Sequence, residues 1–133
     1  MKNVHTEKAP AAVGPYSQAI VSGGFVFTSG QLGITENGEL ANGVARQTAT
    51  ALKNLSKILD AAGSSIDNVV KTTCYLKDIN DFEVFNEIYA NFFEKSPART
   101  LIGAAALPKG ALVEIEAIAE LDKVVVSFNY DND

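Results

Sequence analysis

The stretch that decides the fold is SPARTLIGAAALPKGALVEIEAIAE, which runs from Ser96 to Glu120. Its second half, from Leu112 onward, alternates between two sets of side chains, as in a β-strand with one buried face. We expect the helices to cover the set Val113, Ile115, Ala117, Ala119 and Leu121. The opposite face then carries Leu112, Glu114, Glu116, Ile118 and Glu120. Its three glutamates fit either a solvated surface or a functional site.

The first half of the stretch predicts an oligomer. Thr100 to Leu107 carry no charge on either face, which is typical of a strand that is buried on both sides. A single layer of helices covers only one face of a sheet. We therefore expect the other face to contact a second copy of the chain, and we infer a homo-oligomer.

The last two strands are predicted to form a hairpin. Pro108 to Ala111 have the composition of a turn between a strand at Arg99–Leu107 and one at Leu112–Leu121. In that hairpin Arg99 lies opposite Glu120 and about 20 Å from Glu114, at ~3.3 Å per residue. Arg99 would then either pair with Glu120 or meet a carboxylate from a neighbouring subunit, and the sequence leaves both open.

The rest of the chain predicts an α+β domain with a mixed β-sheet and two helices packed on one face. Gly23 and Gly24 predict a hairpin turn, and the spacing of leucines and alanines predicts an amphipathic helix that ends at Gly63. Asp81 is the predicted N-cap of the second helix, whose stripe of Phe82, Phe85, Tyr89 and Phe92 should face the core. The predicted elements are strands at Ser17–Ser22, Phe25–Ser29 and Val69–Leu76 and helices at Val44–Ala62 and Phe82–Phe93.

Composition limits the class of protein. The 133 residues predict a single domain, 1–133, in which about 122–133 form a C-terminal extension that either adds an edge strand or trails off. No apolar run is long enough to span a membrane, and no secretory signal is recognisable, so we expect a cytoplasmic protein. A net charge of −5 makes nucleic acid an unlikely partner. Cys74 is expected to be buried and His5 to lie at the surface, and one of each predicts no metal site.

Four separated motifs carry a resemblance to a known family. The run PARTLIGAAALPKGALVEIEAIA from Pro97, with GPYSQAI from Gly14, FTSGQ from Phe27 and FNEIYANFF from Phe85, closely resembles the RidA/YjgF family. Its members are reactive intermediate deaminases that hydrolyse 2-iminobutanoate and 2-iminopropanoate. The resemblance covers about His5 to Glu120. It implies a chorismate-mutase-like fold, a homotrimer with ligand sites at the subunit interfaces, and no cofactor.

The resemblance also implies the site residues. Arg99 would bind the carboxylate of an imino or 2-oxo acid, and Glu114 would position or activate water. Tyr16 would donate a hydrogen bond, and the pocket would be lined by Tyr16, Ser29, Gly30 and Asn86. Arg99 and Glu114 would come from different chains. The sequence has Leu101 where many members have a cysteine, so we expect activity to remain and thiol-based modification to be lost.

The residues suit cofactor-free hydrolysis, but two other functions stay open. A guanidinium can grip a carboxylate through two hydrogen bonds, and a glutamate can move protons between water and the leaving amine. The same arginine could instead hold a 2-oxo acid in a noncatalytic regulatory trimer. A ribonuclease or translation inhibitor is the weakest alternative, because the chain is acidic. The preferred imino acid and the pathway that produces it cannot be read from the sequence.

Overall fold

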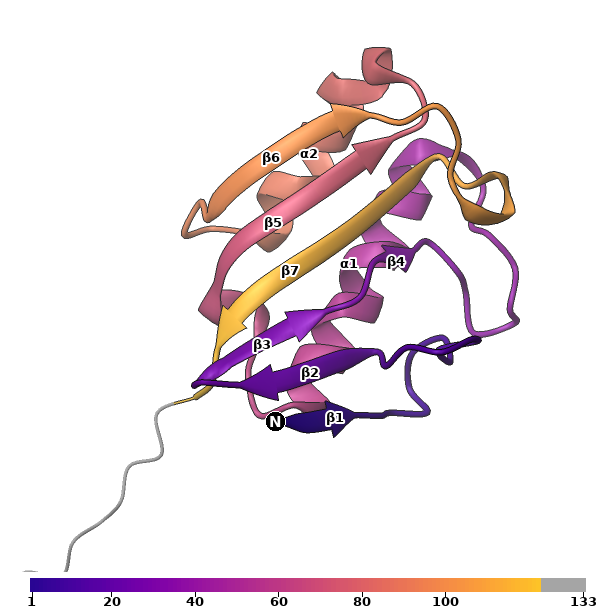
Figure 1. The fold of residues 1–133 in the computed structure, drawn as a ribbon. Helices are drawn as coiled ribbons and strands as arrows, with labels where there is room; N and C mark the ends of the chain where they lie inside the picture. The colour runs from indigo at the N-terminus through magenta and orange to yellow at the C-terminus, as the bar shows by residue number, and fades with distance from the viewer. Residues whose placement is uncertain (123–133) are drawn as a thin grey trace, which may run out of the picture.

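Seven strands form one mixed sheet, and two helices lie on one face of it, in the computed structural model, which describes residues 1–122 (Figure 1). The strand order is β1-β2-β3-β7-β5-β6, and β4 also pairs with β7. The α+β class, the mixed sheet and the single helical layer are confirmed. The predicted extension lies outside the described residues, apart from Asp122. The elements are β1 Lys2–Val4, β2 Ala19–Ser22, β3 Phe25–Thr28, β4 Gln31–Leu32, α1 Gly43–Ala61, β5 Val69–Leu76, α2 Phe82–Phe92, β6 Ala98–Gly103 and β7 Val113–Glu120.

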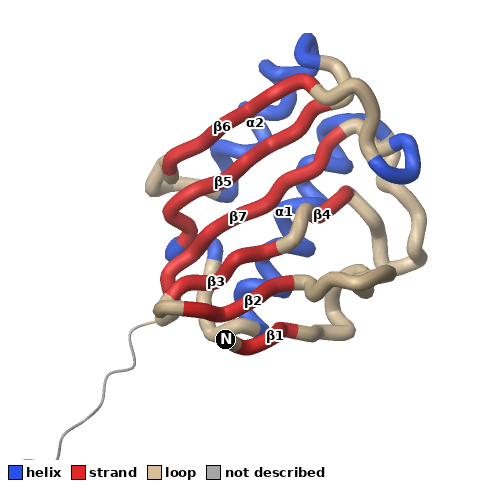
Figure 2. The backbone as a smooth tube through the Cα atoms, in the orientation of Figure 1, coloured by secondary structure: helices blue, strands red, loops and turns tan. Residues whose placement is uncertain are grey.

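Helix α1 follows the predicted apolar spacing and supplies much of the core. Leu52, Leu55 and Leu59 are fully buried, and burying each leucine contributes roughly 1.5–3 kcal/mol. The helix ends where predicted, because Gly63 adopts a φ of 86°, which favours glycine. Figure 2 shows both helices behind the sheet, so the opposite face is left open.

Helix α2 differs from its prediction at both ends. Phe85 and Tyr89 are buried as expected, but Phe82 is 41% exposed and lies beside Arg99 instead of in the core. Phe92 is only half-buried, whereas Phe93, just past the end of the helix, is 5% exposed. Asp81 occupies the N-cap position without a capping hydrogen bond from its side chain. Phe92 still packs against the core, so helical spacing misplaced only Phe82, because the first turn of the helix extends past the packed face.

The predicted hairpin of β6 and β7 is wrong. Strand β5 lies between them: it pairs in parallel with β6, with Thr72 beside Arg99, and antiparallel with β7. Arg99 therefore does not face Glu120, whose partner is Phe25 on β3. Residues 104–112 cross the end of β5, and two backbone hydrogen bonds of 2.8 and 3.0 Å hold them there. A run of uncharged residues fits this crossover as well as it fits a hairpin, so composition could not separate the two.

The two faces of β7 divide as predicted. Val113, Ile115 and Ala119 are fully buried beneath the helices, while Glu114 and Glu116 are half-buried on the open face. Strand β6 is an edge strand in the single chain, with its Ile102 side chain 46% exposed. Phe25, Phe27 and Ile118 add apolar surface to the same open face, where β3 pairs with β7.

Candidate functional site

One cavity of about 550 Å³ lies where the loops around β4 meet the start of β7. Tyr16, Gly30 and Glu114, three of the residues singled out in the sequence, line it together. The N-terminal segment 7–13 forms one wall, and the turn at Pro108 and Lys109 forms another. The carboxylate of Glu114 is thus the acidic group that the sheet itself presents to this cavity.

Gly30 leaves room for the close approach of the Glu114 side chain. A Cβ on Gly30 would lie 2.8 Å from the Glu114 Cδ and closer still to its carboxylate oxygen. Real Cβ atoms do not approach other atoms so closely, so a side chain at position 30 would displace the carboxylate. Leu32 on β4 is the direct partner of Glu114, and this pairing sets the approach. The backbone at Gly30 therefore fixes one side of the Glu114 carboxylate.

Gln18 lines the cavity, and Ser29 supports it from the adjoining backbone. The Ser29 hydroxyl donates to the carbonyl oxygen of Ser17 at 2.5 Å, and its backbone N–H donates to the carbonyl of Gln18 at 2.9 Å. The buried Gln18 amide in turn accepts from the N–H of Thr6 and donates to the carbonyl of Pro10. These bonds tie the N-terminal wall to β2. Tyr16, by contrast, is 53% exposed at the rim.

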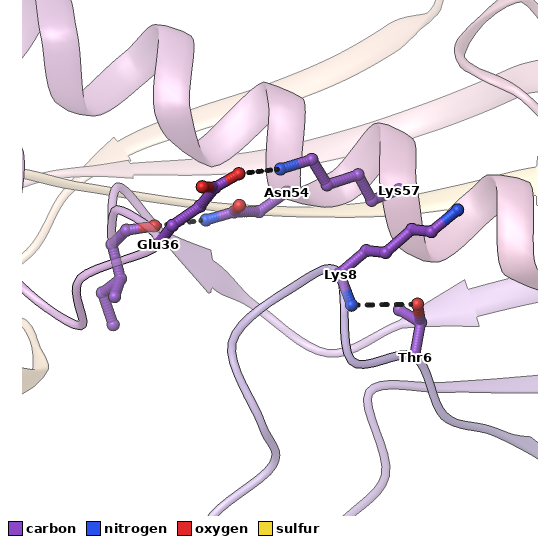
Figure 3. A network of polar contacts seen from close by, with 6 residues as sticks. Thr6, Lys8, Glu36, Asn54 and Lys57 are labelled. Atoms are coloured by element: carbon purple, nitrogen blue, oxygen red, sulfur yellow. Dashed lines mark hydrogen bonds and ion pairs between the residues drawn. The ribbon is translucent and has the colours of Figure 1, made fainter.

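The far wall of the cavity is a polar network between α1 and the loop after β4, drawn in Figure 3. Asn54 of α1 donates from its amide to the carbonyls of Leu32 and Ile34 at 3.2 and 3.0 Å. Glu36 lies 4.0 Å from Lys57, and the exposed pair contributes little stability. The figure shows Lys8 across from this pair, on the N-terminal segment. The wall is therefore held mainly by the Asn54 hydrogen bonds.

Burial and a second carboxylate raise the pKa of Glu114 above its usual range. Loss of hydration is the larger cause, and the negative charge of Glu116 on the same face is the smaller. Glu116 is fixed by the Tyr75 hydroxyl, which donates to its carboxylate at 2.6 Å and whose own pKa is raised to about 12 by that bond. Glu114 can therefore hold and release a proton closer to neutral pH than an exposed glutamate does.

Arg99 and Asn86 form a second cluster away from this cavity. The Arg99 guanidinium donates from Nη1 to the Oδ1 of Asn86 at 2.7 Å. Its Cζ lies 4.9 Å from the centre of the Tyr89 ring, and Phe82 and Phe85 lie slightly farther away. All four neighbours come from α2, so Arg99 points to the helix side of the edge strand β6.

The two clusters lie on opposite faces of the sheet. Thr72, the strand partner of Arg99, bonds to Tyr89 under α2, whereas Glu114 alternates with buried Val113 and Ile115 and faces away from the helices. Arg99 lies beside Thr72 on β5, and Thr72 lies beside Ala117 on β7, three residues from Glu114. Two strand spacings of ~4.8 Å and three residues of ~3.3 Å place the Cα atoms of Arg99 and Glu114 about 14 Å apart. One small ligand cannot contact both residues of the same chain.

Several neighbours of the clusters were not found from the sequence. The sequence predicts that the stripe of Phe82, Phe85 and Tyr89 faces the core, whereas its one-face spacing with Asn86 is the signal that indicates what surrounds Arg99. No sequence pattern indicates that Tyr75 would hold Glu116. Cys74 is buried and His5 exposed, as predicted, and burial raises the Cys74 pKa to about 11.

Two kinds of feature are absent from residues 1–122. Among residues 1–122, no group of three or more His, Cys, Asp or Glu side chains is arranged to hold a metal ion. Over the same residues, neither helix has the length and apolar character needed to cross a lipid bilayer.

Comparison with protein families decides where this fold and these motifs belong. The family model described as Endoribonuclease L-PSP, which represents RidA/YjgF proteins, matches residues 6–121. The chain belongs to the RidA/YjgF family. The match spans both clusters and ends at the last residue of the predicted β-strand pattern, Leu121.

Individual RidA/YjgF relatives carry different names. The chain is 50% identical over 119 residues to the human 2-iminobutanoate/2-iminopropanoate deaminase, covering 87% of each chain. It is 49% identical to a protein of Pyrococcus abyssi named only for the RutC family, covering 87% of this chain and 94% of the relative. Among solved structures, Escherichia coli TdcF with bound serine is 40% identical, with a TM-score of 0.87 over 90% of this chain and 98% of that one.

Proposed function

We propose that the chain hydrolyses reactive 2-imino acids, such as 2-iminobutanoate and 2-iminopropanoate, to 2-oxo acids and ammonia. The observation that carries the proposal is that one chain of this family holds both a guanidinium whose neighbours are neutral and a glutamate whose pKa is raised. The deaminase name of the human relative, at 50% identity, supports the same chemistry.

Arg99 and Glu114 divide the reaction between them. Arg99 holds the carboxylate of the imino acid through charge-assisted hydrogen bonds. Glu114 accepts a proton from water as the water oxygen bonds to the carbon of the protonated imine, and the C=N π electrons move to nitrogen, which gives a neutral carbinolamine. The carbinolamine then collapses: its hydroxyl loses a proton, the nitrogen gains one, and the C–N electron pair leaves with ammonia. A positioned acid–base group contributes roughly 10² to 10⁴ in rate.

We further propose that the site lies between protomers of a homotrimer with the chorismate-mutase-like architecture. The roughly 14 Å estimated between Arg99 and Glu114, on opposite faces of one sheet, means that one chain supplies only half of a site. The open face with Phe27 and Ile118 offers an apolar surface for such an assembly. Ring closure then joins Arg99 of one protomer to Glu114 of its neighbour, with Tyr16, Gly30 and the Ser29 backbone on the Glu114 side.

Mixing two inactive variants tests the reaction and the shared site together. Arg99→Ala and Glu114→Gln should each lose ammonia release from an imine generated in situ. If they are refolded together in equal amounts, roughly one site in four regains both wild-type groups, so about a quarter of the activity returns. Light scattering on the same samples reports the assembly. If the wild type releases no ammonia from the imine, the deaminase proposal is wrong. If the mixed variants recover no activity, the proposal of a site shared between protomers is wrong.

A noncatalytic binding protein is the second candidate, and the TdcF structure favours keeping it, because that relative holds a bound serine. In this case the arginine cluster binds a 2-oxo acid without turnover. Thermal stabilisation by 2-oxobutanoate without ammonia release would support this function over the first.

Ribonuclease activity is the weakest candidate, although the family description contains the word endoribonuclease. The net charge of −5 opposes RNA binding. Cleavage of RNA, with affinity that falls steeply as salt rises, would revive it.

A further inference from the structure

We propose that three aromatic rings of α2 position the Arg99 guanidinium for the substrate carboxylate. This aromatic platform consists of Phe82, Phe85 and Tyr89, whose ring centres lie 5.9, 6.0 and 4.9 Å from the Arg99 Cζ. A cation above an aromatic face is attracted to the ring electrons, which offsets part of the hydration that it loses on burial. The inference rests on the proposed function and names the residues that position Arg99 for substrate binding.

Tyr89 is the fixed part of the aromatic platform. Its hydroxyl shares a 2.7 Å hydrogen bond with the fully buried Thr72, which lies beside Arg99 in the sheet. Its ring packs against Phe93 and Phe85, with ring centres 4.5 and 5.5 Å apart. Burial raises the pKa of Tyr89, so the phenol stays neutral and offers its ring instead of a competing negative charge. The ring therefore has one orientation, and the guanidinium rests on it.

The charge of Arg99 is left available for a ligand. Its one side-chain hydrogen bond within residues 1–122 goes to Asn86, a neutral amide, and the only ion pair in that part of the chain joins Lys57 to Glu36. A structural arginine that is half-buried is normally paired with a carboxylate. Here neutral rings take that place, and most of the five guanidinium N–H donors remain for an incoming carboxylate.

The test measures preference for a carboxylate, which a general loss of stability would not change. The affinities of 2-oxobutanoate and of its neutral amide are measured by calorimetry, and their ratio is compared between variants. Tyr89→Leu should lower this ratio roughly 2- to 30-fold, the range that cation–π attractions cover. Tyr89→Phe keeps the ring and should stay within about twofold of the wild type. Phe92→Leu, a half-buried ring on the same helix outside the aromatic platform, is the matched control and should keep the ratio.

Phe82→Ala gives a second measurement that does not depend on the core. Phe82 is 41% exposed, so this variant should fold, and its ratio should fall less than that of Tyr89→Leu. Val84→Ala, exposed on the same helix turn, is its control. If both platform variants keep the wild-type ratio, the inference is overturned while the deaminase proposal stands. If the wild type itself shows no preference for the acid, the binding role of Arg99 fails as well.

Discussion

The two halves of the site are built by different means. The Arg99 half stands on regular elements, an edge strand and a helix, and packed aromatic side chains surround the guanidinium. The Glu114 half stands where loops converge, and its carboxylate rests against a bare stretch of backbone at Gly30. In the proposed reaction, binding would depend on the side chains packed around Arg99, whereas proton transfer by Glu114 would depend on the absence of a side chain at Gly30. Substitutions should therefore damage the halves in different ways.

The largest effect is expected from removing the cation. Arg99→Ala should lower kcat/KM for a 2-imino acid by about 10² to 10⁴, because two charge-assisted hydrogen bonds of roughly 1.5–3 kcal/mol each are lost. Steady-state ammonia release measures it. Arg46→Ala, an exposed arginine on α1, is the control and should behave as the wild type. A loss smaller than tenfold would remove Arg99 from the site.

Gly30→Ala tests the Glu114 half of the proposed site. The new methyl group would overlap the Glu114 carboxylate, and a displacement of about 1 Å costs on the order of 10² in rate. We expect kcat to fall while binding of 2-oxobutanoate is kept, since Arg99 is untouched. In the control Gly103→Ala, the added Cβ meets Ile79 at an ordinary 3.6 Å. Equal activity of the two alanine variants would contradict the role of the bare backbone.

Asn86→Ala probes how the binding half is aligned. Removing the oxygen that accepts from Arg99 Nη1 should raise KM roughly tenfold with little change in kcat, because the carboxylate keeps the same charge throughout the reaction. Asn91→Ala, exposed on the same helix, serves as the comparison. A change in kcat alone would place Asn86 with proton transfer instead.

The smallest effect is expected at Glu116 and concerns pH. The Glu114 pKa is raised by burial first and by the charge of Glu116 second. A base works deprotonated, so kcat/KM should fall as the pH drops through that pKa. Glu116→Gln removes one cause of the raised pKa, so this acid limb should move to lower pH, and Glu120→Gln should leave it in place. If the acid limb of the pH profile of Glu116→Gln does not move, or moves to higher pH, Glu114 is not the titrating base.

Most of the fold followed from periodicity, and the errors lie where the spacing of residues does not identify the packing partner. The 3.6-residue spacing in α1 and the β-branched run of β5 identify elements of 19 and 8 residues, which are long enough to show their period. The pairing of β6 is different, because the uncharged residues after Arg99 do not reveal which strand lies beside them. The two-residue strand β4 is too short to carry a pattern.

The sequence proposed the candidate site residues but could not predict how they are arranged. Motif resemblance named Arg99, Asn86, Gly30 and Glu114, and the structure groups them in two pairs. Strand alternation placed Glu114 on the open face correctly. The face of the sheet on which the Arg99 side chain lies depends on β6 running parallel to β5. No spacing of residues within β6 predicts this pairing. The partners of Glu116 and Tyr89 arise from contacts between distant elements, so the sequence could not show them.

The position of β7 has a consequence for how the chain is made. This strand, the last one in residues 1–122, is inserted in the middle of the sheet, where it joins β3 and β4 to β5. Until the ribosome has released it, the N-terminal strands and the β5-α2-β6 unit share no common strand, and both present unpaired edges. A nascent chain that stops short of Glu120 therefore has two half-sheets without their link, and we expect it to be a client of chaperones and proteases.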